Sequence, residues 1–281
     1  MTKRCNPKPK ISDKETLSLA DRIVCAECVA FMRGLPDNFL DLTVTSPPYD
    51  NLRDYKGFML DCERIAEELF RITKEGGVAV WVVGDAIKNG NKTLTSFRQA
   101  LLFQEAGFNM HDVMIYKKKN TPFMRSNAYT NCFEFMFVLS KGSPKTFNPI
   151  KEPTARSGFE MLVANKKADG VNNKVLKELK REKTKNNIWE YAVGLGGSTN
   201  DKEAFKHPAI FPEKLAEDHI LSWTNRGDLV FDPFMGSGTT AKMAKKLGRR
   251  YLGCDISQEY VAIAQKRVEE TKEDVSLFQQ T

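Results

Sequence analysis

Histidine is scarce in this chain of 281 residues, and its cysteines are scattered. The three histidines, His111, His207 and His219, lie far apart, and of the six cysteines only Cys25 and Cys28 form a closely spaced pair. A zinc site needs a second such pair or neighbouring histidines, so no metal site is predicted. The residues around the pair read as a strand and not as the start of a helix, which favours buried, reduced thiols over a redox motif.

Long apolar runs are also missing. The longest, Val78 to Val83, is far too short to cross a bilayer, and no apolar segment follows the basic start of the chain. These absences predict a soluble, cytoplasmic protein without membrane contact. Acidic residues are outnumbered, 36 against 43 Lys and Arg, and the net charge of +7 favours an acidic partner such as nucleic acid.

Strand-like runs alternate with amphipathic stretches along most of the chain. In the stretch 61–77, Ile65, Leu69 and Ile72 share one helical face, and a Gly-Gly pair after them is predicted to stop the helix. Alternation at this spacing predicts an α/β fold, with a largely parallel sheet and helices on both of its faces.

This regular pattern fails in a basic segment. Residues 141–190 contain 12 Lys or Arg against 6 Asp or Glu, so they carry +6 of the net +7. Only the stretch 173–183 is predicted to be helical. A basic region between regular halves is a suitable surface for phosphate contacts, and Lys177, Lys180 and Arg181 are the candidates that we select.

A glycine-rich loop between a strand and a helix marks one candidate site. In "VFDPFMGSGTTAKMAKK", Gly236 and Gly238 let a ligand approach the backbone, and the helix that starts at Thr239 offers its first amides. The loop lacks the Walker lysine and the third glycine of the dinucleotide fingerprint. The next strand ends at Asp255, whose carboxylate suits a ribose diol, with a helix-capping role as the alternative. Together these pieces indicate a cofactor that contains a nucleoside.

The run "DLTVTSPPYDN" marks a second candidate site. Its buried strand ends abruptly at Ser46, because the prolines at 47 and 48 cannot donate to a sheet ladder. A rigid polar loop is thus displayed at a strand end, where the sites of open α/β sheets form.

Three motifs together resemble one family, the amino-methylating DNA methyltransferases. "TSPPY" resembles their catalytic motif, "DPFMGSGTT" their S-adenosylmethionine motif, and "HPAIFPEKL" the element that completes the cofactor pocket. The order, catalytic motif first and cofactor motif last, is that of the β group, in which the intervening insertion recognises the target. The resemblance covers most of residues 21–271. It implies a Rossmann-like, S-adenosylmethionine-dependent methyltransferase fold with an irregular basic insertion.

The resemblance also implies a division of the chain and a set of site residues. The division is an arm at 1–20, a catalytic half at 21–142, a target recognition insertion at 143–205, a cofactor-binding half at 206–272 and a tail at 273–281. The catalytic residues are Ser46, Pro47, Pro48 and Tyr49. Cofactor contacts are expected from Glu27, His207, Phe211, Lys214, Asp232, Pro233, Phe234, Gly236, Ser237, Gly238, Thr239, Thr240 and Asp255. DNA contacts are expected from Arg53, Lys117, Lys118, Lys119, Lys177, Lys180 and Arg181.

Glu27 is a departure from the family pattern. Many members carry a Gly-Asp pair near the cofactor, in the strand before the catalytic motif, where this chain has Cys-Ala-Glu-Cys at 25–28. Asn51 and Tyr55 lie with Arg53 on the loop after the catalytic motif, where either DNA contact or simple solvation is expected.

The chemistry of the family accounts for the prolines. An exocyclic amine is a poor nucleophile, because its lone pair is delocalised into the base. Ser46 and the carbonyl of Pro47 would accept the two amino hydrogens and aim the lone pair at the sulfonium methyl, while Tyr49 stacks on a base that has left the duplex. Serine at position 46 favours N4 of cytosine, because members that methylate N6 of adenine mostly have Asp there. Adenine is the alternative.

Double-stranded DNA is the expected partner. A cognate restriction endonuclease and a homodimer accompany some relatives, and the sequence leaves both open. Two other functions are also open: amino-methylation of RNA or of a protein amide, and DNA binding without catalysis. The basic insertion and the two intact motifs argue against them.

Overall fold

The computed structural model contains two compact units, of which residues 148–187 form the smaller. It describes residues 19–48, 60–120, 126, 128–154, 180–207 and 210–274, and the backbone alone of 160–166 and 172–178. The larger unit is made of the described residues before 148 and after 187.

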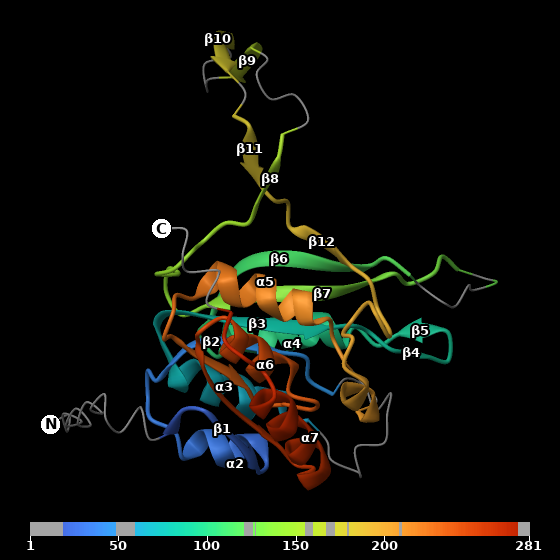
Figure 1. The fold of residues 1–281 in the computed structure, drawn as a ribbon. Coiled ribbons are helices and arrows are strands. Elements are labelled where there is room, and N and C mark those ends of the chain that lie inside the picture. Colours follow the sequence, from blue (N-terminus) through green and yellow to red (C-terminus); the bar gives the residue numbers. More distant parts are fainter. Residues whose placement is uncertain are drawn as a thin grey trace, which may run out of the picture. The chain divides into compact units, whose positions relative to one another are not determined.

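An eight-stranded sheet forms the centre of the larger unit (Figure 1). Neighbouring strands run parallel, except that β7 is antiparallel to both of its neighbours. In spatial order the strands are β1 (Arg22–Cys25), β14 (Arg250–Asp255), β13 (Leu229–Asp232), β2 (Leu40–Thr45), β3 (Thr73–Val83), β7 (Phe133–Ser140), β6 (Asn109–Lys118) and β12 (Ile188–Tyr191). The predicted α/β fold with a largely parallel sheet is confirmed.

Helices cover both faces of this sheet (Figure 1). One layer contains α2 (Cys28–Arg33), α3 (Cys62–Ile72) and α4 (Thr95–Glu105), and the other contains α5 (Glu213–Trp223), α6 (Thr239–Lys246) and α7 (Gln258–Glu269). The crossovers from β2 to β3 and from β13 to β14 move in opposite directions along the sheet. Because crossovers of this kind are right-handed, their helices lie on opposite faces. A short 3-10 helix, η1 (Lys202–Lys206), precedes α5.

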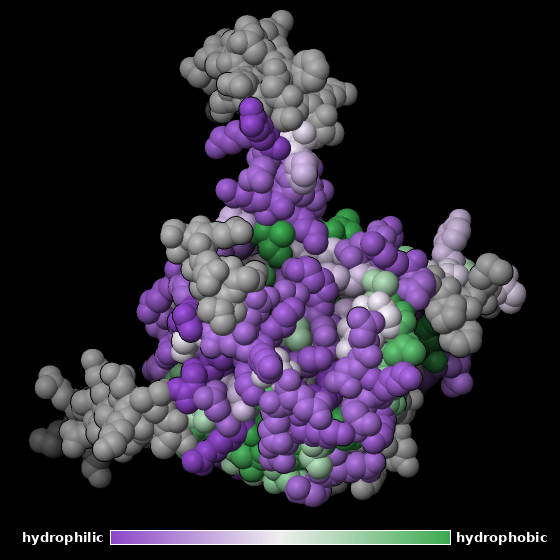
Figure 2. All heavy atoms as spheres, viewed as in Figure 1, coloured by the Kyte–Doolittle hydropathy of each residue, from purple (hydrophilic) through white to green (hydrophobic). Residues whose placement is uncertain are grey.

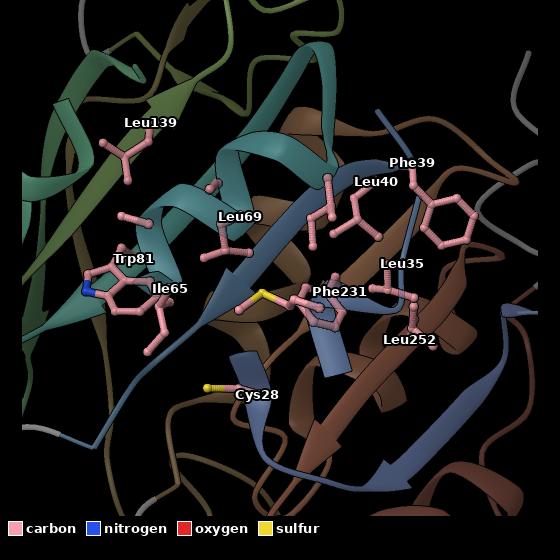
Figure 3. Close-up of a cluster of buried hydrophobic side chains, with 14 of the residues drawn as sticks. Cys28, Leu35, Phe39, Leu40, Ile65, Leu69, Trp81, Leu139, Phe231 and Leu252 are labelled. Atoms are coloured by element: carbon pink, nitrogen blue, oxygen red, sulfur yellow. The ribbon is translucent and has the colours of Figure 1, made fainter. Parts of the chain in front are cut away.

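The main core lies between the sheet and the layer that contains α3. Ile65 and Leu69 of α3 belong to one buried cluster with Trp81 and Phe231 of the sheet (Figure 3). The indole N–H of Trp81, in the middle of this cluster, donates to Gln99 at 2.8 Å, so the one polar group of the ring is satisfied. A second, smaller cluster lies beneath α6 and α7.

The predicted Gly-Gly stop of α3 is wrong. The helix ends before Thr73, whose hydroxyl donates to the Leu69 carbonyl at 2.6 Å and so satisfies one of the last carbonyls of the helix. Gly76 and Gly77 lie inside β3, near an irregularity in its pairing with β2. The φ of Gly76 is +79°, which glycine adopts without strain, so the pair shapes a strand and not a helix end.

The smaller unit consists of two antiparallel ribbons. One pairs β8 (Lys151–Pro153) with β11 (Glu182–Thr184), and the other pairs β9 (Glu160–Lys166) with β10 (Asn172–Glu178). The helix predicted at 173–183 is therefore wrong. Its Lys, Leu and Glu residues favour a helix, but the register of the second ribbon sets Val175 opposite Val163, and cross-strand pairing overrides local propensity.

The predicted insertion at 143–205 is longer than this smaller unit. Residues 188–191 form β12, which pairs in parallel with β6 at the edge of the large sheet, so the segment from 188 onwards belongs to the larger unit.

A second addition to the regular fold is the hairpin of β4 (Ile87–Lys88) and β5 (Asn91–Lys92). Its Asn-Gly turn has positive φ at both residues, as two-residue hairpins prefer.

Hydrophilic side chains cover most of the larger unit on the face shown in Figure 2. Within the described part of the chain, every helix is too short or too polar to span a membrane.

Candidate active site

The carboxyl ends of β13 and β2 meet near the centre of the sheet. The two strands pair in parallel, with Val230 opposite Leu42. The chain leaves β13 through α6 towards β14 and leaves β2 through α3 towards β3, so the connections diverge here. Open α/β sheets bind ligands at such a point. Both motifs from the sequence lie there, because Asp232 ends β13 and Ser46 follows β2.

A buried hydrogen bond ties these two strand ends together. The Thr45 hydroxyl donates to Asp232 Oδ1 at 2.7 Å, and the backbone N–H of Phe234 donates to the same oxygen at 3.0 Å. Burial raises the pKa of the Asp232 carboxyl to about 6, although both hydrogen bonds oppose the rise. Asp232 is predicted to contact the cofactor, yet these described contacts of its carboxylate are internal and link the glycine loop to the catalytic strand.

The catalytic motif itself is described up to residue 48. Ser46 and Pro48 are half-buried, and Pro47 is buried. The predicted stacking residue Tyr49 and the loop residue Arg53 lie outside the described residues, as do Asn51 and Tyr55.

Close packing explains the two glycines of the loop that follows β13. A Cβ on Gly238 would lie 2.7 Å from the Cβ of Ala264 in α7, and a Cβ on Gly236 would lie 3.0 Å from Nε2 of His207. Both glycines have positive φ, +50° at Gly236 and +83° at Gly238. Any side chain at these positions would push the loop away from α7 or from His207.

The other predicted contacts in this loop are largely buried. Pro233 and Ser237 are buried, and Phe234 is half-buried with its ring 6.0 Å from that of Trp81. The loop therefore presents mainly backbone and small side chains at the strand ends.

The first turn of α6 carries one hydroxyl with a partner and one without. The Thr240 hydroxyl donates to the Val44 carbonyl of β2 at 3.0 Å, which is a second link between the two motifs. Thr239 is 3% exposed, and its hydroxyl has no hydrogen-bond partner among the described residues. Gly238 at the N-cap has no side chain to cap the helix. A buried unpaired hydroxyl beside uncapped amides fits a bound polar group.

Asp255 holds the glycine loop from the adjacent strand. Its Oδ2 accepts the N–H of Gly236 at 2.9 Å, and its Oδ1 accepts the N–H of Ser257 at 2.9 Å. The alternative role as the cap of α7 belongs to Ser257, whose hydroxyl accepts the N–H of Tyr260. The Asp255 carboxylate is half-buried, and each oxygen keeps a lone pair for a further donor such as a ribose hydroxyl.

The "HPAIFPEKL" element contributes His207 to this region. The His207 ring is buried between Gly236 and the ring of Tyr260, whose centroid is 4.3 Å away. Phe211 is half-buried. Lys214, which is predicted to contact the cofactor, pairs within its own helix, with its Nζ 2.8 Å from Asp218 Oδ1.

Glu27 lies at the end of β1, beside the end of β14. Its carboxylate caps α2 and accepts the N–H groups of Val29 at 2.9 Å and Ala30 at 2.7 Å. Partial burial raises the pKa of Glu27, but these two hydrogen bonds outweigh it and hold the pKa below the usual value. The carboxylate predicted to face the cofactor is thus exposed and engaged in capping a helix.

Cys25 and Cys28 are free thiols, but Cys25 is exposed, so the expectation that both are buried is wrong for Cys25. Cys28 is the first residue of α2, so the expectation of a strand at this position is wrong. Burial raises the pKa of the Cys28 thiol far above its usual value, which disfavours the reactive thiolate. Among the described residues, no group of three or more His, Cys, Asp or Glu side chains is arranged to hold a metal ion.

The predicted DNA-contacting lysines of the larger unit lie at the carboxyl end of β6. Lys117 pairs with Glu190 at 3.0 Å, and Lys118 pairs with Glu134 at 2.6 Å. Lys119 is exposed.

In the smaller unit, Lys180 and Arg181 are exposed and line a surface depression together with Lys151 and Glu182. The side chain of Lys177 lies outside the described residues.

Arg267 is a site residue that the sequence pattern did not predict. It is 1% exposed and donates to the carbonyl of Ser237 in the glycine loop. The available signal was its position in α7, beside Val268 and three residues after Ala264, on the helix face that is otherwise apolar.

Comparison with known proteins assigns this architecture to a family. A family model described as DNA methylase, for N6 and N4 methylation, matches residues 40–266. The orphan methyltransferase M.BamHII of Bacillus amyloliquefaciens is 53% identical over 240 residues, which cover 84% of this chain and 91% of that protein. The type II methyltransferase M.HinfI of Haemophilus influenzae is 27% identical over 89% of this chain and 68% of its own.

Solved structures share the fold at lower identity. The PvuII DNA methyltransferase, described as cytosine-N4-specific, matches with a TM-score of 0.64 at 20% identity, over 87% of this chain and 85% of its own. A DNA modification methylase of Thermus thermophilus, solved with S-adenosyl-L-methionine, matches with a TM-score of 0.59 at 22% identity, over 88% and 92%. With a family model over residues 40–266 and a relative of 53% identity over most of both chains, the chain belongs to the N6/N4 DNA methylase family.

Proposed function

We propose that this DNA methyltransferase transfers the methyl group of S-adenosylmethionine to N4 of a cytosine that is flipped out of double-stranded DNA. The observation that carries the proposal is the buried bond between Thr45 and Asp232, at 2.7 Å. It joins the residue before Ser46 to the residue that opens the glycine loop. A methyl donor on the loop and an amine at the Ser-Pro-Pro-Tyr motif would therefore be held at adjacent strand ends, and such displacement depends chiefly on positioning.

The residues of the catalytic motif act on the amine. The Ser46 hydroxyl and the Pro47 carbonyl each accept one amino hydrogen, which turns the nitrogen lone pair out of the plane of the base. Pro47 and Pro48 restrict the backbone, so the two acceptors keep their separation without reorganising. Tyr49 stacks on the flipped base and offsets part of the free energy of unstacking.

The loop residues act on the cofactor, which supplies an electrophilic sulfonium methyl. The Asp255 carboxylate accepts the ribose hydroxyls, and the uncapped amides of α6 with the Thr239 hydroxyl hold further polar atoms of the cofactor. His207 packs on the loop and forms one wall of the pocket. Lys214 and Glu27 have no part in this arrangement, because their charged groups are engaged within α5 and at the start of α2.

Ser46 is the reason for choosing cytosine. Members of the family that methylate adenine N6 mostly carry Asp at this position, whereas serine occurs in those that methylate cytosine N4. The PvuII enzyme is described as cytosine-N4-specific, but at 20% identity its likeness concerns the fold. Adenine N6 is the second candidate, because the rest of the base pocket also selects the base.

The smaller unit would recognise the target sequence. Residues 148–187 contain ten Lys or Arg against five Asp or Glu, and a two-stranded antiparallel ribbon has the width that the major groove of DNA admits. Lys180 and Arg181 are exposed beside the β8–β11 ribbon, where they can reach phosphates. The relative from B. amyloliquefaciens is named an orphan, which favours a solitary enzyme over one with a cognate restriction endonuclease.

The test is to incubate the purified full chain with S-adenosylmethionine and unmethylated genomic DNA, and to identify the modified nucleosides by mass spectrometry. N4-methylcytosine is expected. N6-methyladenine would retain the mechanism and overturn the inference from Ser46. With neither product, parallel reactions on RNA and on protein amides, together with a DNA-binding assay, separate the two remaining alternatives. A reaction without S-adenosylmethionine serves as the blank, and the Tyr49→Ala variant serves as a control of reduced activity.

A further inference from the structure

Arg267 is buried although it is charged, and each side of its guanidinium group has an acceptor. Nε donates to Asp201 Oδ2 at 2.6 Å, and Nη2 donates to Glu213 Oε1 at 2.8 Å. Nη1 donates to the carbonyl of Ser237 and also to its hydroxyl oxygen, at 3.2 Å. A planar guanidinium can satisfy three such directions at once, which a lysine ammonium on its flexible stem does not reproduce.

The two carboxylates bracket the segment that carries His207. Asp201 caps η1 before this segment, and Glu213 is the first residue of α5 after it. Lys242 of α6 completes the cluster, with its Nζ 2.7 Å from Glu213 Oε1 and 3.8 Å from Asp201 Oδ2. Two cations thus balance two carboxylates, of which Arg267 is buried and the other three groups are half-buried, and such pairing is the condition under which a buried charge is tolerated.

The third partner of Arg267 lies in the glycine loop itself. Ser237 stands between the two glycines, and Gly238 packs against Ala264, which precedes Arg267 by one helical turn. One face of α7 therefore holds the loop by van der Waals contact and by a charged hydrogen bond. The same guanidinium holds both ends of the His207 segment, whose imidazole packs on Gly236.

We propose that Arg267 is a positioning residue for S-adenosylmethionine, which locks the glycine loop and the His207 segment into the arrangement that the cofactor requires. The inference rests on the proposed placement of the cofactor at this loop. Removing the guanidinium leaves two half-buried carboxylates with Lys242 as their cation, and it takes one donor away from the Ser237 carbonyl and from the carboxylate at each end of the segment. Cofactor affinity then falls, while Ser46 and Pro47, which are not among the described hydrogen-bond partners of Arg267, retain their action once the cofactor is bound.

The experiment compares Arg267→Met and Arg267→Lys with Arg249→Met in the full chain. Arg249 is a matched control because it is also buried and donates to the Thr224 and Leu247 carbonyls, at 2.8 and 2.6 Å, away from the loop, before the amino end of β14. The dissociation constant of S-adenosylmethionine is measured by calorimetry, corrected for the folded fraction. The KM for cofactor and kcat at saturating cofactor are measured on DNA.

We expect Arg267→Met to raise the dissociation constant and the KM for the cofactor by at least tenfold, with kcat changed by less than about threefold. Arg267→Lys should lie between this variant and wild type, and Arg249→Met should keep wild-type affinity in its folded fraction. Equal affinities of the Met variants at 267 and 249 would overturn the inference. If Arg267→Met does not fold, Arg267→Lys decides, since wild-type cofactor affinity in that variant also overturns it.

A further variant, Asp255→Asn, separates this inference from the proposed function. If Asp255→Asn binds the cofactor as wild type does, the proposed placement of the cofactor is wrong. If Asp255→Asn binds weakly while Arg267→Met and Arg267→Lys bind normally, the placement stands and the role of Arg267 is wrong.

Discussion

The charges at the switch point and those of the smaller unit are handled in opposite ways. Around the glycine loop, Asp232 and Arg267 are almost fully buried, and each is matched by hydrogen bonds or by opposite charge. Beside the β8–β11 ribbon, Lys180 and Arg181 are exposed. Buried, matched charges fix geometry and respond to pH, whereas exposed cations attract phosphate and respond to salt.

This difference separates two tasks. A methyl transfer requires atoms that stay in place, and the network from Thr45 through Asp232 to the glycine loop provides them without further reorganisation. Binding to a polyanion requires cations that can exchange water and counterions for phosphate. Perturbing each region should therefore affect one task and leave the other nearly intact.

The largest expected effect is at Tyr49. Tyr49→Ala should lower kcat by roughly 10- to 100-fold, because base–aromatic stacking contributes about 1–3 kcal/mol. Cofactor affinity should be unchanged, and Tyr49→Phe, which keeps the ring, should retain most of the activity. Single-turnover methyl transfer and calorimetric cofactor binding measure the two quantities. An equal loss of cofactor binding would contradict the division between base pocket and cofactor pocket.

The next effect concerns pH. The folded-state pKa of Asp232 is about 6, above the value of about 3.9 for an unfolded Asp. The protonated carboxyl thus favours the folded state fully below about pH 4, and this contribution is lost as the pH rises to about 6. Asp232→Asn removes this dependence, so its unfolding free energy relative to wild type should rise by about 2–3 kcal/mol from pH 4 to pH 7.

Urea unfolding of both proteins across this pH range measures the difference. Any constant cost of the asparagine amide cancels, because only the slope of the difference with pH is compared. A difference that stays flat between pH 4 and pH 7 would mean that the carboxyl is not shielded from water in solution.

A smaller effect is expected in the smaller unit. The triple variant Lys177→Ala, Lys180→Ala and Arg181→Ala should weaken DNA binding roughly tenfold and reduce the slope of log affinity against log salt by about 2–3, near 0.9 for each phosphate that is no longer neutralised. Cofactor affinity should not change. Fluorescence anisotropy over a salt series gives both numbers.

The matched control neutralises Arg22, Arg33 and Arg64, three exposed cations of the larger unit on β1, α2 and α3. It changes the net charge equally, so it shows how much of the effect is nonspecific. If both triple variants reduce the salt slope by the same amount, the smaller unit is not a specific DNA surface.

Prediction from the sequence succeeded where the structure depends on residues close together in the chain, and it failed where the structure depends on residues far apart in the chain. Hydrophobic periodicity predicted the alternation of strands and helices and the buried face of α3, and motif positions placed Ser46 and Gly236 at strand ends. Local propensity failed at 173–183, because strand pairing with residues 160–166 decides the structure there. It also missed Arg267, whose partners lie 30 to 66 residues away in the chain, so no local pattern contains them.

The charged residues of the candidate site also have partners that a local motif does not show. Lys214 fits the family pattern by position, and Glu27 stands where many members carry a Gly-Asp pair, but the motif does not show their partners, Asp218 and the amides that open α2. A motif gives the position of a residue in the chain, whereas the neighbouring charges determine which partner its charged group binds.

The smallest effect is expected at the lysines 117–119, at the carboxyl end of β6. Within these three residues, ion-paired and exposed cations again lie side by side. Lys118 is matched by Glu134 at 2.6 Å and lies 5.8 Å from the centroid of the Tyr116 ring, whereas Lys119 is exposed. Only an exposed cation can exchange counterions for phosphate without first breaking an ion pair. We therefore expect Lys119→Ala to weaken DNA binding about two- to threefold and to reduce the salt slope by up to about 1.

Lys118→Ala should leave the salt slope of DNA binding unchanged, since the residue it removes is already neutralised. The same anisotropy series measures both variants, with wild type as the reference. If Lys118→Ala flattens the slope and Lys119→Ala does not, ion pairing in the free protein does not predict which cations meet DNA. Ion-paired and exposed cations would then differ in the free protein alone, because DNA would be able to displace Glu134 from Lys118.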